Sequence, residues 1–157
     1  MKNKSHRIKP YIISVLITLA AGGISGFLVR NSMSVYETLN KPVLSPPGIV
    51  FPIVWTVLYI MMGIAAGRIY NSDFQDRGGL LSIYALQLFF NAIWPIIFFG
   101  VQWLLLSFVW LIVLWLLIII MTAGFYKADK GAAYLLIPYL VWVTFAGYLN
   151  LGICILN

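Results

Sequence analysis

Aromatic and amide side chains recur at helical spacing along three apolar stretches of this 157-residue sequence. The three sets are Phe51, Trp55 and Tyr59; Tyr84, Gln87, Asn91, Trp94 and Phe98; and Pro138, Trp142, Ala146 and Asn150. Residues three or four apart lie on one face of a helix. A buried amide must find a partner inside hydrocarbon, so we expect these faces to point inward. Together they would wall an apolar cavity that suits a flat, hydrophobic, partly polar ligand such as a porphyrin or a sterol.

A simpler interpretation of the same residues is packing. Trp and Tyr gather at the two membrane–water interfaces, and Trp103 fits that role because it begins its apolar stretch. Asn91 and Asn150 would then serve only as contacts between helices, at about 1 kcal/mol each. Trp142 lies near the middle of its stretch and fits an interfacial position less well, whereas Trp55 fits either. The residues alone leave a ligand pocket and plain packing as equal alternatives.

Ionisable side chains are missing from the apolar stretches. The four acids, Glu37, Asp73, Asp76 and Asp129, lie between stretches, and His6 lies in the N-terminal tail. Proton-driven pumps usually carry ionisable groups within the membrane, so we do not expect one here. The usual general acids and bases of a hydrolase are absent from the stretches as well. Without a Cys/His cluster we expect no metal site, and the single Cys154 excludes an internal disulfide.

The elements that must position these residues are membrane-spanning helices. The chain is 62% hydrophobic and 9% charged, whereas a water-soluble domain is about a quarter charged. A helix crosses the hydrocarbon core with about 20 mostly apolar residues. Five stretches qualify, and they predict an all-α integral membrane protein, a five-transmembrane-helix bundle forming one domain over residues 1–157: residues 11–29, 49–69, 80–101, 103–126 and 132–156.

The first stretch, with a basic tail before it and small residues from Ala20 to Gly23, also resembles a secretory signal, but its apolar length favours a retained helix. The connection 30–48 is long and contains Pro42, Pro46 and Pro47. Long loops often carry function, so we expect this first loop to cover a pocket as a lid.

Basic residues predict the orientation. Of the ten Lys and Arg residues, only Arg30 and Lys41 lie on the side opposite the N-terminal tail. The other eight lie on the side of the tail: Lys2, Lys4, Arg7, Lys9, Arg68, Arg77, Lys127 and Lys130. The excess marks the cytoplasmic side, which places the first loop and the C-terminus outside. The net charge of +6 therefore reflects membrane orientation and is no evidence for a nucleic-acid partner.

Two GxxxG pairs, Gly22 with Gly26 and Gly63 with Gly67, predict close approach of helices. Packing within one bundle explains them at least as well as formation of a homodimer does.

The ordered motifs resemble those of the translocator protein family, also called tryptophan-rich sensory proteins or peripheral-type benzodiazepine receptors. Three blocks over nearly the whole chain carry the resemblance: Tyr36, Lys41-Pro42, Pro46-Pro47, Phe51, Trp55 and Tyr59; Tyr84, Gln87-Leu88, Asn91, Trp94 and Phe98-Phe99; and Pro138-Tyr139, Trp142, Phe145-Ala146, Leu149-Asn150 and Asn157.

The resemblance implies a five-helix bundle, often dimeric, with a ligand cavity under the first loop. It implies binding of protoporphyrin IX or related tetrapyrroles as ligands, with no required cofactor, and in some bacterial members light-dependent porphyrin degradation. By motif position the ligand-binding residues would be Tyr36, Pro46, Trp55, Tyr59, Asn91, Trp94, Trp142 and Ala146. Trp55 and Trp142 would stack on the ring and serve any photo-oxidation, while the helices 11–29 and 103–126 would be mainly structural.

One departure from the family concerns sterols. Animal members carry a cholesterol motif in which a basic residue follows a Tyr, but no Lys or Arg follows Tyr148 as far as Asn157. We therefore expect a bacterial-type member in a plasma membrane that binds porphyrins rather than cholesterol. A transporter of hydrophobic small molecules such as porphyrins or sterols is the alternative function.

Overall fold

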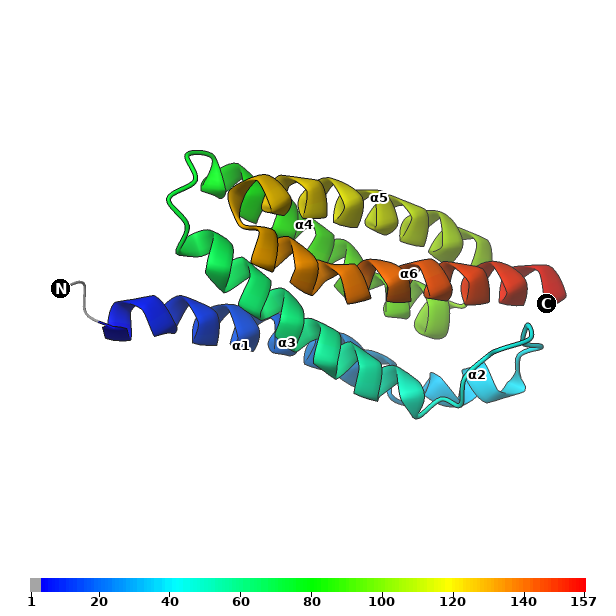
Figure 1. Cartoon of the computed structure of the whole chain (residues 1–157). Coiled ribbons are helices and arrows are strands. Elements are labelled where there is room, and N and C mark those ends of the chain that lie inside the picture. The colour runs from blue at the N-terminus through cyan, green and yellow to red at the C-terminus, as the bar shows by residue number, and fades with distance from the viewer. Residues whose placement is uncertain (1–3) are drawn as a thin grey trace.

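The computed structural model describes residues 4–157 of the chain as a bundle of helices (Figure 1). The helices are α1 (Lys4–Val29), α2 (Met33–Thr38), α3 (Val50–Tyr70), α4 (Arg77–Pro95), the π-helical segment η1 (Ile96–Val101), α5 (Leu104–Ala128) and α6 (Lys130–Leu156). Within these residues, five helices are long and apolar enough to cross a membrane. The predicted five-span, all-α fold is confirmed.

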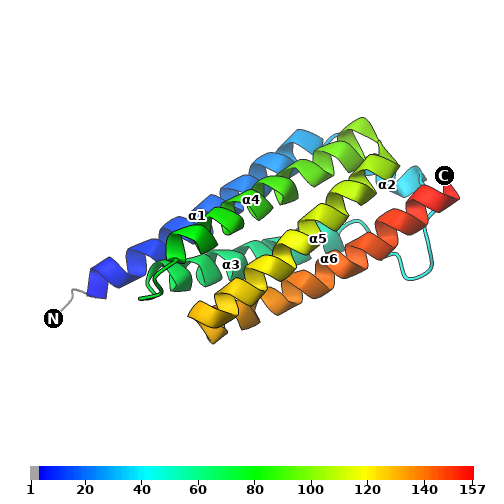
Figure 2. The same ribbon diagram turned by 90° about the horizontal axis from the view of Figure 1, so that it is seen from above.

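The five long helices close into a ring. α1 packs against α3 and α4, α3 packs against α6, and α5 packs against both α4 and α6. Viewed from above, the long helices lie side by side along one common direction (Figure 2). The start of α1 and the end of α6 lie at opposite ends of the bundle (Figure 1), as an odd number of crossings requires.

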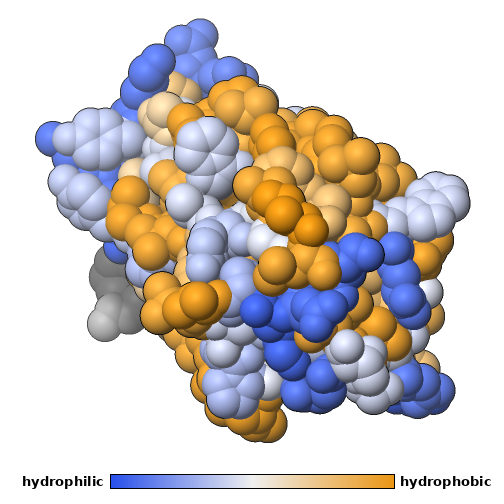
Figure 3. All heavy atoms as spheres, turned by 90° about the vertical axis from the view of Figure 1, so that its right-hand side faces the viewer, coloured by the Kyte–Doolittle hydropathy of each residue, from blue (hydrophilic) through white to orange (hydrophobic). Residues whose placement is uncertain are grey.

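The end that carries α2, the first loop and the C-terminus is of mixed character. Figure 3 views this end and shows hydrophilic residues gathered in patches beside hydrophobic ones. Large apolar side chains are exposed along all five long helices, for example Phe27 at 63% and Leu105 at 66%. In water such exposure would be unfavourable, but in a bilayer these side chains face lipid.

Helix ends follow local chemistry. Asp76 accepts a hydrogen bond from the Gly79 N–H at the start of α4, and Asp129 accepts one from the Ala132 N–H at the start of α6. Both are N-cap positions, where a carboxylate oxygen satisfies an otherwise unpaired backbone donor. The turn from η1 into α5 has Gln102 in the left-handed region at φ 60°, a conformation that ends a helix sharply.

The predicted helix 80–101 is two pieces. Pro95 has no N–H to donate to the carbonyl of the preceding turn, which interrupts the α-helical ladder. The α-helix therefore ends at Pro95 and the chain continues as the wider η1. Neither this change nor the short α2 inside the first loop was expected from the sequence.

Glycines bring α1 and α3 together. A Cβ atom on Gly63 would lie 2.5 Å from Val15 Cα, and one on Gly67 would lie 2.9 Å from Tyr11 Cα. Only residues without a side chain permit such contact between backbones. The Gly63–Gly67 pair is therefore used inside the bundle, which answers for this pair the choice between bundle packing and a dimer.

Candidate functional site

A cavity of about 310 Å³ lies between α1, α3 and the junction of α4 with η1. We call it the lateral cavity. Three of the predicted site residues, Trp55, Tyr59 and Trp94, line it. The other lining residues are Leu19, Gly22, Gly23, Ser25, Gly26, Val29, Met33, Phe51, Pro52, Thr56, Pro95 and Phe99.

Small residues of α1 make this space. Gly22, Gly23, Ser25 and Gly26 form one wall, and a Cβ atom on Gly26 would meet nothing within 4 Å. Gly22 differs, because a Cβ atom there would overlap the ring of Tyr59. The glycine wall therefore admits the aromatic side chains of α3 at one point and leaves open volume beside them.

Aromatic rings form the opposite wall. Trp55 and Tyr59 are stacked, with ring centroids 5.6 Å apart and an interplanar angle of 29°. Trp94 meets Phe99 edge to face at 6.1 Å. Such rings offer flat apolar faces to a ligand, and each additional stacked pair contributes about 0.5–1.5 kcal/mol.

The lateral cavity opens sideways. Gly23, Gly26, Pro52 and Thr56 are lining residues and are also exposed. They lie on α1 and α3, two of the helices that are long and apolar enough to cross a membrane. The cavity therefore opens between these two helices.

A chain of hydrogen bonds leads from the cavity wall into the core. The Tyr59 hydroxyl donates to Asn91 Oδ1 at 2.6 Å, and Asn91 Nδ2 donates to the Tyr139 hydroxyl at 2.8 Å. The Tyr139 hydroxyl donates to Gln87 Oε1 at 2.8 Å, and Gln87 Nε2 donates to Met62 Sδ at 3.9 Å. All five residues are buried. The expected inward direction of Gln87 and Asn91 is thus observed, with Tyr139 as the partner that supplies a hydroxyl.

Asn150 anchors a second group of buried contacts. Its Oδ1 accepts hydrogen bonds from Trp94 Nε1 and from the Ser107 hydroxyl, each at 3.1 Å. Tyr36, Trp94 and Ala146 meet beside it around a void of only about 10 Å³, close to the volume of one water. Side chains fill the space where the faces of α3, α4 and α6 converge.

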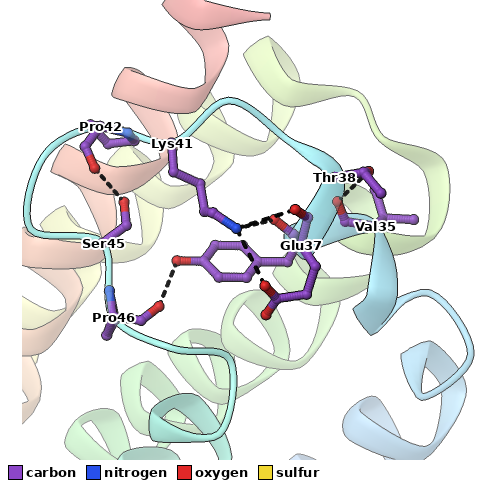
Figure 4. Close-up of polar contacts among 8 residues, drawn as sticks. Val35, Glu37, Thr38, Lys41, Pro42, Ser45 and Pro46 are labelled. Atoms are coloured by element: carbon purple, nitrogen blue, oxygen red, sulfur yellow. Dashed lines mark hydrogen bonds and ion pairs between the residues drawn. The ribbon is translucent and has the colours of Figure 1, made fainter.

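The first loop is held together by Tyr36, which is buried in α2. Its hydroxyl donates to the Pro46 carbonyl at 3.0 Å, and its ring meets Phe51 edge to face at 5.2 Å. Burial raises the pKa of the Tyr36 hydroxyl, and the negative charge of Glu37 adds to this effect, whereas a hydrogen bond with Ser45 opposes it. The hydroxyl therefore remains a donor at neutral pH. Figure 4 shows Lys41 reaching toward Glu37, to which its ammonium lies 3.5 Å away.

The same loop is tied to the end of α6. The Asn40 N–H donates to Asn157 Oδ1 at 3.0 Å, and Asn157 Nδ2 donates to the Asn40 carbonyl at 2.9 Å. The Tyr148 hydroxyl donates to the Val43 carbonyl at 2.6 Å. The loop is therefore anchored to α6 on one side, while Met33 of α2 lines the lateral cavity on the other.

Trp142 lies away from the lateral cavity. It lines an open groove between α3 and α6 of about 560 Å³ together with Val57, Met61 and Pro138. Its ring meets Phe51 edge to face at 6.0 Å, and Phe51 lines the cavity. The eight predicted site residues therefore do not share one pocket. They lie in the lateral cavity (Trp55, Tyr59, Trp94), the hydrogen-bond chain (Asn91), the small void beside Asn150 (Ala146), the first loop (Tyr36, Pro46) and this groove (Trp142).

The cavity residues on α1 were missed from the sequence, where this helix was expected to be mainly structural. Gly22, Gly23, Ser25 and Gly26 follow one another closely within an apolar span. A run of small residues in a span that faces an aromatic-rich helix was the available signal, but we attributed Gly22 and Gly26 to helix packing or dimer formation.

Sequence comparisons with known proteins all point to one family. The sequence profile of the TspO/MBR family matches residues 14–156. The chain is 38% identical to the tryptophan-rich protein TspO of Chlorobaculum tepidum, over 85% of each chain. It is 38% identical to the tryptophan-rich sensory protein of Cereibacter sphaeroides, over 78% of this chain and 76% of that protein. It is 31% identical to the translocator protein of Bos taurus, over 90% of this chain and 88% of that protein. The resemblance read from the motifs is confirmed, and the chain belongs to the TspO/MBR family.

Proposed function

We propose that this protein is a membrane receptor that binds protoporphyrin IX, or a related flat hydrophobic tetrapyrrole, in the lateral cavity. The relatives named as a sensory protein and as translocator proteins support a role as a membrane receptor or transporter. The observation that carries the proposal is the stacked Trp55–Tyr59 pair facing a glycine wall across about 310 Å³.

The shape of the cavity suits a flat ring. Ligand sites occupy about 300–1,000 Å³, so this cavity is at the lower end of that range. One edge of the macrocycle enters between Trp55 and the glycines of α1, and the remainder occupies the opening toward lipid. Because the opening faces hydrocarbon, the ligand arrives from the bilayer rather than from water.

The location of the cavity along the bundle, combined with the orientation that the basic residues predict, indicates in which leaflet of the membrane the ligand site lies. Its residues belong to the last turns of α1, the first turns of α3 and the end of α4. They lie near the first loop, which the count of basic residues predicts to be outside. We propose a plasma-membrane protein with a cytoplasmic N-terminus and a ligand site in the outer leaflet.

A porphyrin titration of the purified protein in lipid nanodiscs tests the proposal. Removing the Trp55 ring with Trp55→Ala should weaken binding at least threefold, because an aromatic contact contributes about 0.5–1.5 kcal/mol beyond its buried area. Trp103→Ala is the matched control, since Trp103 is 62% exposed at the start of α5 and lies outside the lining. Equal affinities of wild type, Trp55→Ala and Trp103→Ala would contradict the proposal.

A transporter of hydrophobic molecules is the alternative, and close packing disfavours it. Toward the N-terminal end of the bundle the backbones of α1 and α3 are in contact at Gly63 and Gly67. A path that continued from the lateral cavity between α1 and α3 would have to pass this contact. Porphyrin flux into vesicles with and without the protein decides between the two functions, and protein-dependent flux would favour transport.

Light-dependent porphyrin degradation is a second proposed activity, favoured by the presence of both Trp55 and Trp94 in the lining. An excited porphyrin in the cavity would take one electron from an adjacent indole, and dissolved dioxygen would be the oxidant consumed as the ring is degraded. Loss of porphyrin absorbance under illumination should be slower in Trp55→Phe than in wild type. Trp142→Phe should differ less, because Trp142 lines the α3–α6 groove. Equal decay without protein would remove the activity.

A further inference from the structure

The hydrogen-bond chain from Met62 to Tyr59 has a fixed direction. Its far end is the Met62 sulfur, which lies 3.9 Å from Gln87 Nε2 and accepts hydrogen bonds but has none to donate. Gln87 must therefore turn its NH₂ group toward Met62. Its Oε1 is then left facing Tyr139.

Each following member of the chain is set by the one before it. Gln87 Oε1 can only accept, so the Tyr139 hydroxyl donates to it at 2.8 Å. The Tyr139 oxygen can then only accept from Asn91, whose Nδ2 lies 2.8 Å away. Asn91 consequently turns Oδ1 toward Tyr59, which donates its hydroxyl hydrogen at 2.6 Å.

The opposite direction is disfavoured by the same groups. If Tyr59 accepted from Asn91, then Asn91 Oδ1 would accept from Tyr139, and Gln87 would have to donate to Tyr139. Gln87 Oε1 would then face the Met62 sulfur, placing two acceptors together in a buried site. Both residues are completely buried, so water cannot relieve that contact.

The other hydroxyl groups of the lining also donate their hydrogens to protein acceptors. Ser25 donates to the Ala92 carbonyl and Thr56 to the Pro52 carbonyl, each at 2.7 Å. The indole N–H of Trp94 donates to Asn150. After these donations, the oxygens of Ser25, Thr56 and Tyr59 have only lone pairs left, with which they can accept. Among the lining side chains, only the Trp55 indole has an N–H that does not donate to a protein acceptor.

We propose that Tyr59, held as a donor to Asn91 by this chain, offers the lateral cavity an acceptor lone pair, so that the site selects flat ligands carrying an N–H or O–H donor. The inference rests on the proposed function and narrows its ligand class. Within that ligand class, a ring with a free pyrrole-type N–H binds more tightly than the same ring with that nitrogen blocked. Met62 acts here as a positioning residue, through Gln87, Tyr139 and Asn91.

Two ring compounds that differ in one donor provide the test. Carbazole has an N–H, and 9-methylcarbazole has a methyl group in its place. Binding of both to the full chain in nanodiscs should favour carbazole by about three- to tenfold, the effect of one hydrogen bond. Tyr59→Phe, which keeps the ring and removes the lone pairs, should reduce this ratio toward one.

Variants at the Met62 end of the hydrogen-bond chain test whether the direction of the hydrogen bonds, rather than the shape of the site, sets the preference for carbazole. Met62→Leu keeps the volume but removes the acceptor for Gln87, so the chain can reverse and the carbazole preference should fall. Met61→Leu is the matched control, because Met61 lines the α3–α6 groove, and it should keep the wild-type ratio.

A ratio of one in wild type, or a ratio that neither Tyr59→Phe nor Met62→Leu changes, would overturn the inference. Protoporphyrin IX titrated on the same preparations distinguishes the two levels of the account. If it binds while the carbazole ratio is one, only the donor preference fails. If neither carbazole nor protoporphyrin IX shows saturable binding, the proposed function and this inference both fail.

Discussion

Gly63 of α3 lies so close to Val15 of α1 that a Cβ atom on Gly63 would be 2.5 Å from Val15 Cα. This contact fixes the distance between the two helices that wall the lateral cavity. Further along α1, Gly26 lines the cavity, and a Cβ atom there would meet nothing within 4 Å.

The first prediction concerns that contact. Gly63→Ala should destabilise the protein by about 1–3 kcal/mol, because the added methyl group forces α1 away from α3. The measurement is the melting temperature in detergent. Gly23→Ala is the control, since a Cβ atom there also meets nothing within 4 Å. A melting temperature of Gly63→Ala equal to that of Gly23→Ala would show that the helices are not in contact here.

The second prediction concerns the ion pair at the opposite end of the bundle. Arg68 Nη2 lies 2.9 Å from Asp129 Oδ1. Partial burial opposes ionisation of Asp129, but the hydrogen bond from Arg68 and those from the Ala132 and Gly131 N–H groups outweigh it and hold its pKa below the ordinary value. A carboxylate with a lowered folded-state pKa stabilises the fold above its unfolded pKa, and the stabilisation is lost as pH falls through the folded pKa.

Asp129→Asn should therefore lower the melting temperature at pH 7, and the difference from wild type should shrink below about pH 4, where the unfolded carboxyl titrates. Asn retains an oxygen to cap α6, so the variant isolates the charge. Asp73→Asn, at an exposed position, is the control. A difference that stays constant from pH 7 to pH 3 would exclude a role for the Asp129 charge.

The third prediction concerns the anchoring of the first loop. Asn157→Ala removes both side-chain hydrogen bonds to Asn40, so the loop should exchange its amide hydrogens faster, above all at the Asn40 N–H. Hydrogen-exchange mass spectrometry of residues 39–46 measures this. Asn31→Ala, an exposed residue in the same connection, should leave exchange unchanged. Unchanged protection in Asn157→Ala would mean that the Tyr148 hydroxyl, the hydrogen bond from Asn40 Nδ2 to the Leu156 carbonyl and packing are enough to hold the loop.

The membrane-spanning fold was predictable because apolar length is a property of single segments. Each span shows its length and scarcity of charge without reference to its neighbours. The end of the α-helix at Pro95 and the short α2 were not predicted. The first depends on how the ladder is repaired after a proline, and the second on docking of Tyr36 against Phe51, which lies outside its own segment.

The site was only partly predictable, since a cavity is a property of two facing helices. The spacing of Trp55, Tyr59 and Asn91 correctly indicated residues that face inward. It could not show that the faces of α3, α4 and α6 meet through Tyr139 and fill their shared space. Nor could it show that the open volume lies on the side of α1, because that depends on glycines whose absent side chains form no amphipathic pattern.

The central claim is that the ligand occupies the space beside Gly26, and Gly26→Leu tests it most directly. A Cβ atom at Gly26 would meet nothing within 4 Å, so we expect a leucine there to extend into the cavity; protoporphyrin IX should then bind at least about tenfold more weakly while the melting temperature is retained. Ala20→Leu, at an exposed position of α1 outside the lining, should bind as wild type does. Wild-type affinity in Gly26→Leu would contradict the account.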